Sequence, residues 1–111
     1  MSYISYDDFE KVDIRVGKVI KVEDFPKARK PAYKVWVDFG ELGIKKSSAQ
    51  ATGLYSKEEL EGRLVLAVVN FAPKQVADFM SEILILGLAS ESDEVVLVEP
   101  ERQVPLGRRL F

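Results

Sequence analysis

The chain has 111 residues, of which 47% are hydrophobic, and 16 basic against 18 acidic residues give a formal charge of −2. This size suits one compact core, and no apolar run reaches the roughly 20 residues of a membrane-spanning helix. Cysteine and histidine are both absent, which removes disulfides, thiolate nucleophiles, most transition-metal sites and the side chain that titrates near neutral pH. We therefore expect one domain over residues 1–111, without catalytic activity, cofactor or membrane insertion.

The first strong pattern covers residues 12–23, which predict a long, half-buried strand. Its aliphatic side chains recur at even positions, and mostly polar residues stand between them: Val12, Ile14, Val16, Ile20 and Val22. Gly17 and Lys18 interrupt this alternation. A glycine at such a point indicates a bulge, so we expect the strand to bend there and serve both halves of a barrel. The segment before it lacks the basic and apolar regions of a secretory signal, which predicts a cytoplasmic location.

Residues 25–32 contain two prolines and predict a loop. Between positions 27 and 34 the chain carries four cations and no acid: Lys27, Arg29, Lys30 and Lys34. This run is either an ordinary solvated loop or a local contact for a polyanion. Because the whole molecule is slightly acidic, any polyanion binding must be local.

The next two segments predict a hairpin. Over residues 33–39, Tyr33, Val35, Val37 and Phe39 alternate with polar residues and Trp36. Residues 40–43 form the turn, and the more polar residues 44–51 return as a third strand. The alternation places Trp36 beside Lys34 on the outer face, where an indole flanked by cations stacks on bases. Packing of Trp36 inside the barrel, or under a partner subunit, is an equally open alternative.

The second half of the chain predicts one short helix and three further strands. Ser56 and Glu59 form a capping box, and Gly62 ends the helix. The unbroken apolar run over residues 63–71 predicts a strand covered on both sides. Residues 73–80 predict a short helix or an irregular turn, and residues 83–88 and 94–99 the last strands. The fold class is therefore all-β with short helices, arranged as a five-stranded OB-fold barrel.

Two more features lie outside this pattern. Asn70 and Lys74 follow the buried strand, where an amide and an ammonium can hold phosphate or a peptide carbonyl. Asn70 capping a helix at Pro73, and Lys74 as an ordinary surface lysine, are the alternatives, and Ser81 is similarly ambiguous. The tail over residues 100–111 keeps apolar side chains such as Leu110 and Phe111, which predicts that it is ordered.

Four segments in order along the chain resemble the CsaA-type secretion chaperones: residues 8–19, 45–50, 68–74 and 81–87. That family is similar to the tRNA-binding domains appended to some methionyl- and phenylalanyl-tRNA synthetases. The resemblance implies an OB-fold homodimer with N- and C-terminal extensions and an export-related chaperone role. In the tRNA-binding branch, the positions matching Ile83 and Leu84 usually read Gly-Met, so their replacement here favours the chaperone branch.

The resemblance implies a chaperone that binds unfolded or precursor polypeptides as a homodimer, and the lack of a nucleotide-binding motif predicts that it acts without ATP. The alternative is a tRNA-binding module that recognises folded RNA through the OB-fold surface. No catalytic residue, metal site or cofactor is expected. The candidate residues for peptide or RNA binding are Lys30, Lys34, Trp36, Lys46, Ser48, Asn70, Lys74 and Ser81.

Overall fold

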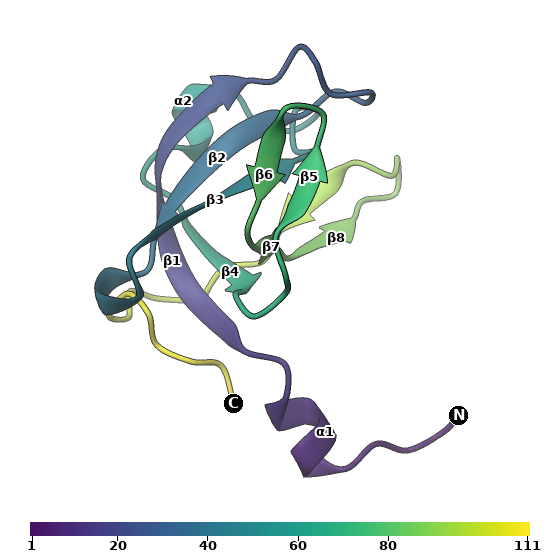
Figure 1. The fold of residues 1–111 in the computed structure, drawn as a ribbon, viewed down its shortest axis with the longest axis vertical. Coiled ribbons are helices and arrows are strands. Elements are labelled where there is room, and N and C mark those ends of the chain that lie inside the picture. Colours follow the sequence, from purple (N-terminus) through teal and green to yellow (C-terminus); the bar gives the residue numbers. More distant parts are fainter.

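The computed structural model describes residues 1–111 as a nearly closed antiparallel β-barrel with two small hairpins (Figure 1). The barrel strands pair in the order β3-β2-β1-β4-β7, and β5-β6 and β8-β9 form the hairpins. The strands are β1 Ile14–Asp24, β2 Tyr33–Asp38, β3 Ile44–Ala49, β4 Leu64–Val68, β5 Lys74–Val76, β6 Phe79–Ser81, β7 Leu84–Ile85, β8 Gly87–Ala89 and β9 Val95–Leu97. The helices are α1 Tyr6–Glu10, α2 Lys57–Leu60 and a 3-10 turn Gly40–Leu42, and neither α-helix has the length or apolar character to cross a bilayer. The five-stranded OB-type barrel is thereby confirmed.

Strand β1 serves both halves of the barrel, as expected, but its irregularity is not at Gly17. The first half of β1 pairs with β4 and the second half with β2, and the register shifts between Val19 and Lys21. Before the shift Gly17 and Val19 face the core, and after it Val22 does, so Ile20 is 43% exposed while Val19 is buried. The prediction that Ile20 faces the core was therefore wrong. Gly17 instead leaves room inside the barrel for the side chains of Val37 and Phe39, which come from the neighbouring strand β2 and the residue after it.

The core lies inside the barrel and is built from alternating strand residues, as the pattern over residues 33–39 predicted. Phe39 and Val37 are fully buried, and β4 is buried on both sides around Val65. Leu60 of α2 caps one end of this core. The Ser56 capping box and the left-handed Gly62 (φ +86°) were both predicted correctly.

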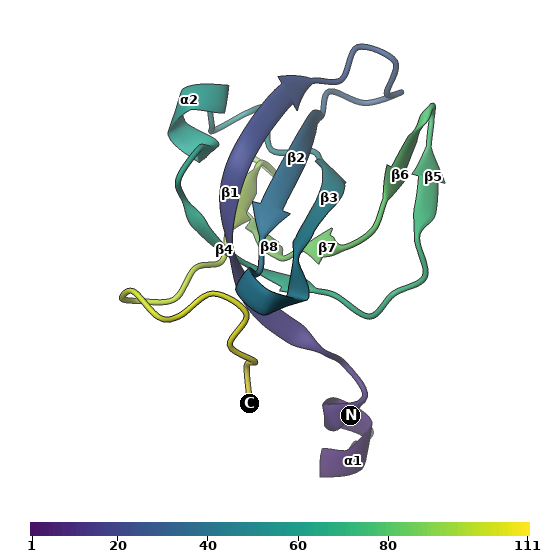
Figure 2. The ribbon, with the colours of Figure 1, turned by 60° about the vertical axis from the view of Figure 1, so that its left-hand side comes forward.

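Residues 74–81 form a β-hairpin, not the predicted helix or irregular turn. Its two-residue turn is Ala77-Asp78, and Ala77 has a positive φ of 52°. The sequence does not predict such a turn, because the usual Asn-Gly or Asp-Gly pair is missing. Phe79 anchors the hairpin in a second small core with Phe25 and Ala32. Figure 2 shows the hairpin standing beside the barrel wall rather than within it.

Both chain ends lie at the same end of the barrel (Figures 1 and 2). The tail is ordered because its backbone follows the first half of β1: the Gly107 N–H donates to Val16 O at 2.8 Å, and the Leu110 N–H donates to Ile14 O at 2.8 Å. Helix α1 was missed in the sequence, although Ser5 and Asp8 form a capping box that marks it. Before it, residues 1–5 are exposed.

Candidate functional site

A groove of about 1070 Å³ lies between the β5-β6 hairpin, the loop before β2 and the end of β3. Its apolar surface comes mainly from the two alanines of the loop and from Phe71, Val76, Ile83 and Leu84. Phe71 is 57% exposed, so an aromatic face is available to a ligand. The polar lining residues are Arg29, Lys30, Ser47, Ser48, Gln50, Lys74, Gln75, Ser81 and Glu82.

Three cations line this groove and one acid faces them. Arg29, Lys30 and Lys74 are exposed, and none of them forms an ion pair within the chain. The single acid, Glu82, already accepts a hydrogen bond from the Lys46 N–H at 3.0 Å. The groove therefore combines an apolar surface with positive charge that is free to meet a carboxylate, a phosphate or a carbonyl.

An aromatic and lysine cluster lies beside the groove on the outer face of the barrel. The Trp36 ring meets Phe79 edge to face, with centroids 5.8 Å apart, and Lys21 Nζ lies 4.6 Å from the Trp36 centroid. Lys34 and Lys46 place their ammonium groups 5.4 and 5.3 Å from the Phe79 centroid. Trp36 thus points outward, as the alternation predicted. The hairpin of the same chain and Lys21 cover part of the ring, so Trp36 is half-buried.

Serine side chains join the end of β3 to the chain between β6 and β7. The Ser48 N–H donates to Ser81 Oγ at 3.2 Å, and Ser47 Oγ lies 3.1 Å from Ile83 O. The Glu82 N–H donates to Lys46 O at 2.8 Å along the same edge. These contacts bridge the gap between β3 and β7, which are not paired as strands. Ser81 therefore helps to close the barrel and to hold one wall of the groove.

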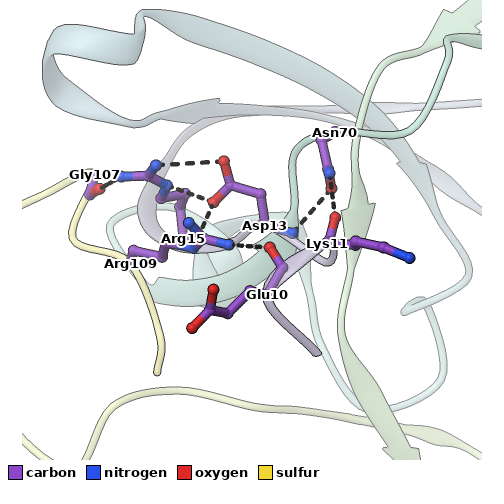
Figure 3. A network of polar contacts seen from close by, with 7 residues as sticks. All are labelled: Glu10, Lys11, Asp13, Arg15, Asn70, Gly107 and Arg109. Atoms are coloured by element: carbon purple, nitrogen blue, oxygen red, sulfur yellow. Dashed lines mark hydrogen bonds and ion pairs between the residues drawn. The ribbon is translucent and has the colours of Figure 1, made fainter. Parts of the chain in front are cut away.

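Asn70 belongs to a polar network that also includes the segment before β1, the start of β1 and the C-terminal tail (Figure 3). Its Oδ1 accepts from the Asp13 N–H at 3.0 Å, and its Nδ2 donates to Lys11 O at 2.7 Å. The Asp13 carboxylate pairs with Arg15 at 2.6 Å and with Arg109 at 3.5 Å. Since no helix follows Asn70, the expected alternative of a helix cap was wrong. Its amide joins the exit of β4 to the segment before β1.

The eight residues selected from the sequence thus fall into three places. Lys30, Ser48, Lys74 and Ser81 line the groove. Lys34, Trp36 and Lys46 form the neighbouring cluster around Phe79. Asn70 lies in the network of Figure 3. The sequence did not single out Phe71 or Gln75, and their only signal was proximity to the Asn70 and Lys74 motif.

One ion pair links the loop before β2 to the tip of the hairpin. Lys27 Nζ lies 3.0 Å from Asp78 Oδ2, and both side chains are exposed. The hydrogen bond from Lys27 holds the pKa of Asp78 below its ordinary value of 3.8. This pair ties together two of the elements that flank the groove.

Comparisons with known proteins agree with this architecture. The chain is similar to the crystal structure of the chaperone CsaA from Bacillus anthracis, with 45% identity and a TM-score of 0.93 over 99% of this chain and 100% of that one. The CsaA chaperone protein from Picrophilus torridus is 47% identical, with a TM-score of 0.91 over 98% of this chain and 100% of that one.

A second set of relatives consists of much longer enzymes. The methionine–tRNA ligase of Thermococcus kodakarensis is 37% identical over 110 residues, which are 99% of this chain but 14% of the enzyme. Residues 14–109 match the family model described as "Putative tRNA binding domain". The match covers the whole barrel, both hairpins and most of the tail, and the chain therefore belongs to the tRNA-binding-domain family, with a fold like that of the CsaA chaperones.

Proposed function

We propose that this chain is a non-enzymatic, ATP-independent chaperone that holds unfolded or precursor polypeptides during export. It would act in the cytoplasm as a homodimer. The observation that carries the proposal is the groove, where exposed apolar side chains such as Phe71 lie beside cations without acidic partners. Such a site accepts apolar side chains of many sequences, and clients would be bound while unfolded and released by mass action.

The chain ends support the homodimer. Tyr3, Ile4 and Phe111 are 96%, 72% and 106% exposed. Burial of these side chains against a second copy would remove apolar surface from water. Both ends lie at one end of the barrel, so a second copy would cover them together (Figure 2). Analytical ultracentrifugation tests this, and a monomer at micromolar concentration would contradict it.

A decisive test of the chaperone proposal measures the aggregation of a chemically denatured client after dilution, with and without the protein. We expect suppression at one dimer per client, and Phe71→Ser together with Val76→Ser to remove most of it. Ile44→Ser is the matched control, because Ile44 is equally exposed at 58% but is not part of the groove. Aggregation that is unchanged by the unaltered protein would refute the proposal.

The second candidate function is tRNA binding, which the family match and the three unpaired cations of the groove favour. Affinity for RNA would fall with salt by roughly one power per neutralised phosphate, whereas apolar peptide binding would change little. Titrating labelled tRNA and a labelled unfolded peptide at two salt concentrations separates the two functions. If tRNA binds, Lys30→Glu with Lys74→Glu should weaken it strongly and reduce the salt dependence. If neither change weakens RNA binding, the RNA binds outside this groove.

A further inference from the structure

Strand β5 has a free edge inside the groove. It pairs only with β6, in a sheet of two strands, so no strand lies on its other side. Four consecutive residues of this segment line the groove: Lys74, Gln75, Val76 and Ala77. Successive side chains of a strand point to opposite faces, so a cavity that touches all four runs along the strand edge.

The backbone groups at this edge belong to Gln75. The pair Val76–Phe79 closes the two-residue turn of the hairpin, and Gln75 lies opposite Met80 as the next pair. In an antiparallel ladder, hydrogen-bonded and non-hydrogen-bonded pairs alternate, and the pair that closes a two-residue turn is hydrogen-bonded. The Gln75 N–H and C=O therefore point away from β6. Gln75 has no backbone hydrogen bond to any residue outside the strands.

We propose that an extended polypeptide binds in the groove as an added strand along β5, with main-chain hydrogen bonds to Gln75. This inference rests on the proposed polypeptide-binding function and gives it a mechanism. Main-chain groups are the same in every polypeptide, so strand addition tolerates many client sequences. Apolar client side chains would then meet Val76 and Phe71. RNA has no alternating N–H and C=O groups, so it does not bind in this way.

The first test replaces single backbone N–H groups of the ligand by N-methyl groups. The probe is a labelled ten-residue peptide of leucine, alanine and serine in a non-repeating order with capped ends, measured by fluorescence anisotropy. Gln75 supplies one free C=O, so one N–H of the added strand donates to it, and methylation should weaken binding about tenfold at that residue and less than twofold at the residues beside it. The unaffected positions are the internal control.

The outcomes separate this inference from the function on which it rests. If the unmodified peptide does not bind, both the proposed polypeptide-binding function and the added strand are refuted. A peptide that binds but shows no position sensitive to methylation refutes only the added strand. A profile with one sensitive position between insensitive neighbours supports both.

The second test changes the protein. Gln75→Pro removes the N–H from the free edge, where proline is tolerated because the ladder to β6 does not use that group. We expect Gln75→Pro to bind peptide about tenfold more weakly than Gln75→Ala, which loses the same side chain but keeps the N–H. Equal binding by both variants would overturn the proposal. Circular dichroism checks the fold, and if the proline variant does not fold, the methylation scan on the unaltered protein decides alone.

Discussion

Removal of the Asn70 amide should reduce stability and leave ligand binding intact. Asn70→Ala deletes the hydrogen bond from the Asp13 N–H at 3.0 Å and the one to Lys11 O at 2.7 Å. Each bond contributes about 0.5–1.5 kcal/mol net, and the exposed position of Asn70 favours the lower part of that range. We therefore expect a loss of about 1–2 kcal/mol in the free energy of unfolding.

Urea denaturation followed by circular dichroism measures this loss, and peptide and tRNA titrations in buffer measure binding by the folded protein. Asn70→Asp keeps the acceptor for Asp13 but sets a carboxylate oxygen against the Lys11 carbonyl, so it should destabilise at least as much as alanine. Gln50→Ala is the control, because Gln50 lines the groove but forms no hydrogen bond within the chain. The reasoning is refuted if Asn70→Ala unfolds like the unaltered protein and yet loses its ligand, since Asn70 would then contact the ligand directly.

Two further predictions concern the barrel wall and the mouth of the groove. Gly17→Ala would place a Cβ 2.4 Å from Val37 Cγ1 and 2.7 Å from Phe39 Cε1, both fully buried side chains. We expect it to lower the free energy of unfolding, measured with heat or urea, by about 1–3 kcal/mol. An unchanged melting temperature would contradict the close approach. Because the folded pKa of Asp78 lies below its ordinary value of 3.8, the Lys27–Asp78 contribution is complete above that pH and disappears as the pH falls below it. Carboxyl-carbon NMR should show that Asp78 is protonated only at a lower pH than an ordinary aspartate. Lys27→Met should return the pKa of Asp78 toward 3.8. If Lys27→Met leaves the titration of Asp78 unchanged, Lys27 is not the cause of the lowered pKa.

Local sequence patterns were enough to predict much of the barrel. Alternation over residues 33–39 identified the core face of β2, because each side chain there meets only the inside or the outside of one wall. The Ser56 capping box predicted α2, since all its hydrogen bonds lie within four residues. The same logic would have found α1 from Ser5 and Asp8.

The candidate site depended on contacts between distant parts of the chain, which no local pattern contains. The bulge at Ile20 lies in the pairing of β1 with β2, just beyond the residues of β1 that pair with β4. The hairpin over residues 74–81 forms despite an unfavourable turn at Ala77, because Phe79 gains a buried place against Phe25 and Ala32. Asn70 likewise finds its partners 57 and 59 residues away.

The sequence by itself therefore determined that the chain forms one small β-barrel without the side chains of cysteine or histidine chemistry, because composition and alternation are properties of the chain alone. Only the tertiary structure decided that Trp36 packs against Phe79, that Ser81 helps to close the barrel and that Lys30 and Lys74 share a groove. The physical reason is that alternation along a strand predicts the face on which a side chain lies. Its neighbours on that face come from the hairpin and the loop, which are distant in sequence and reach it only through tertiary packing.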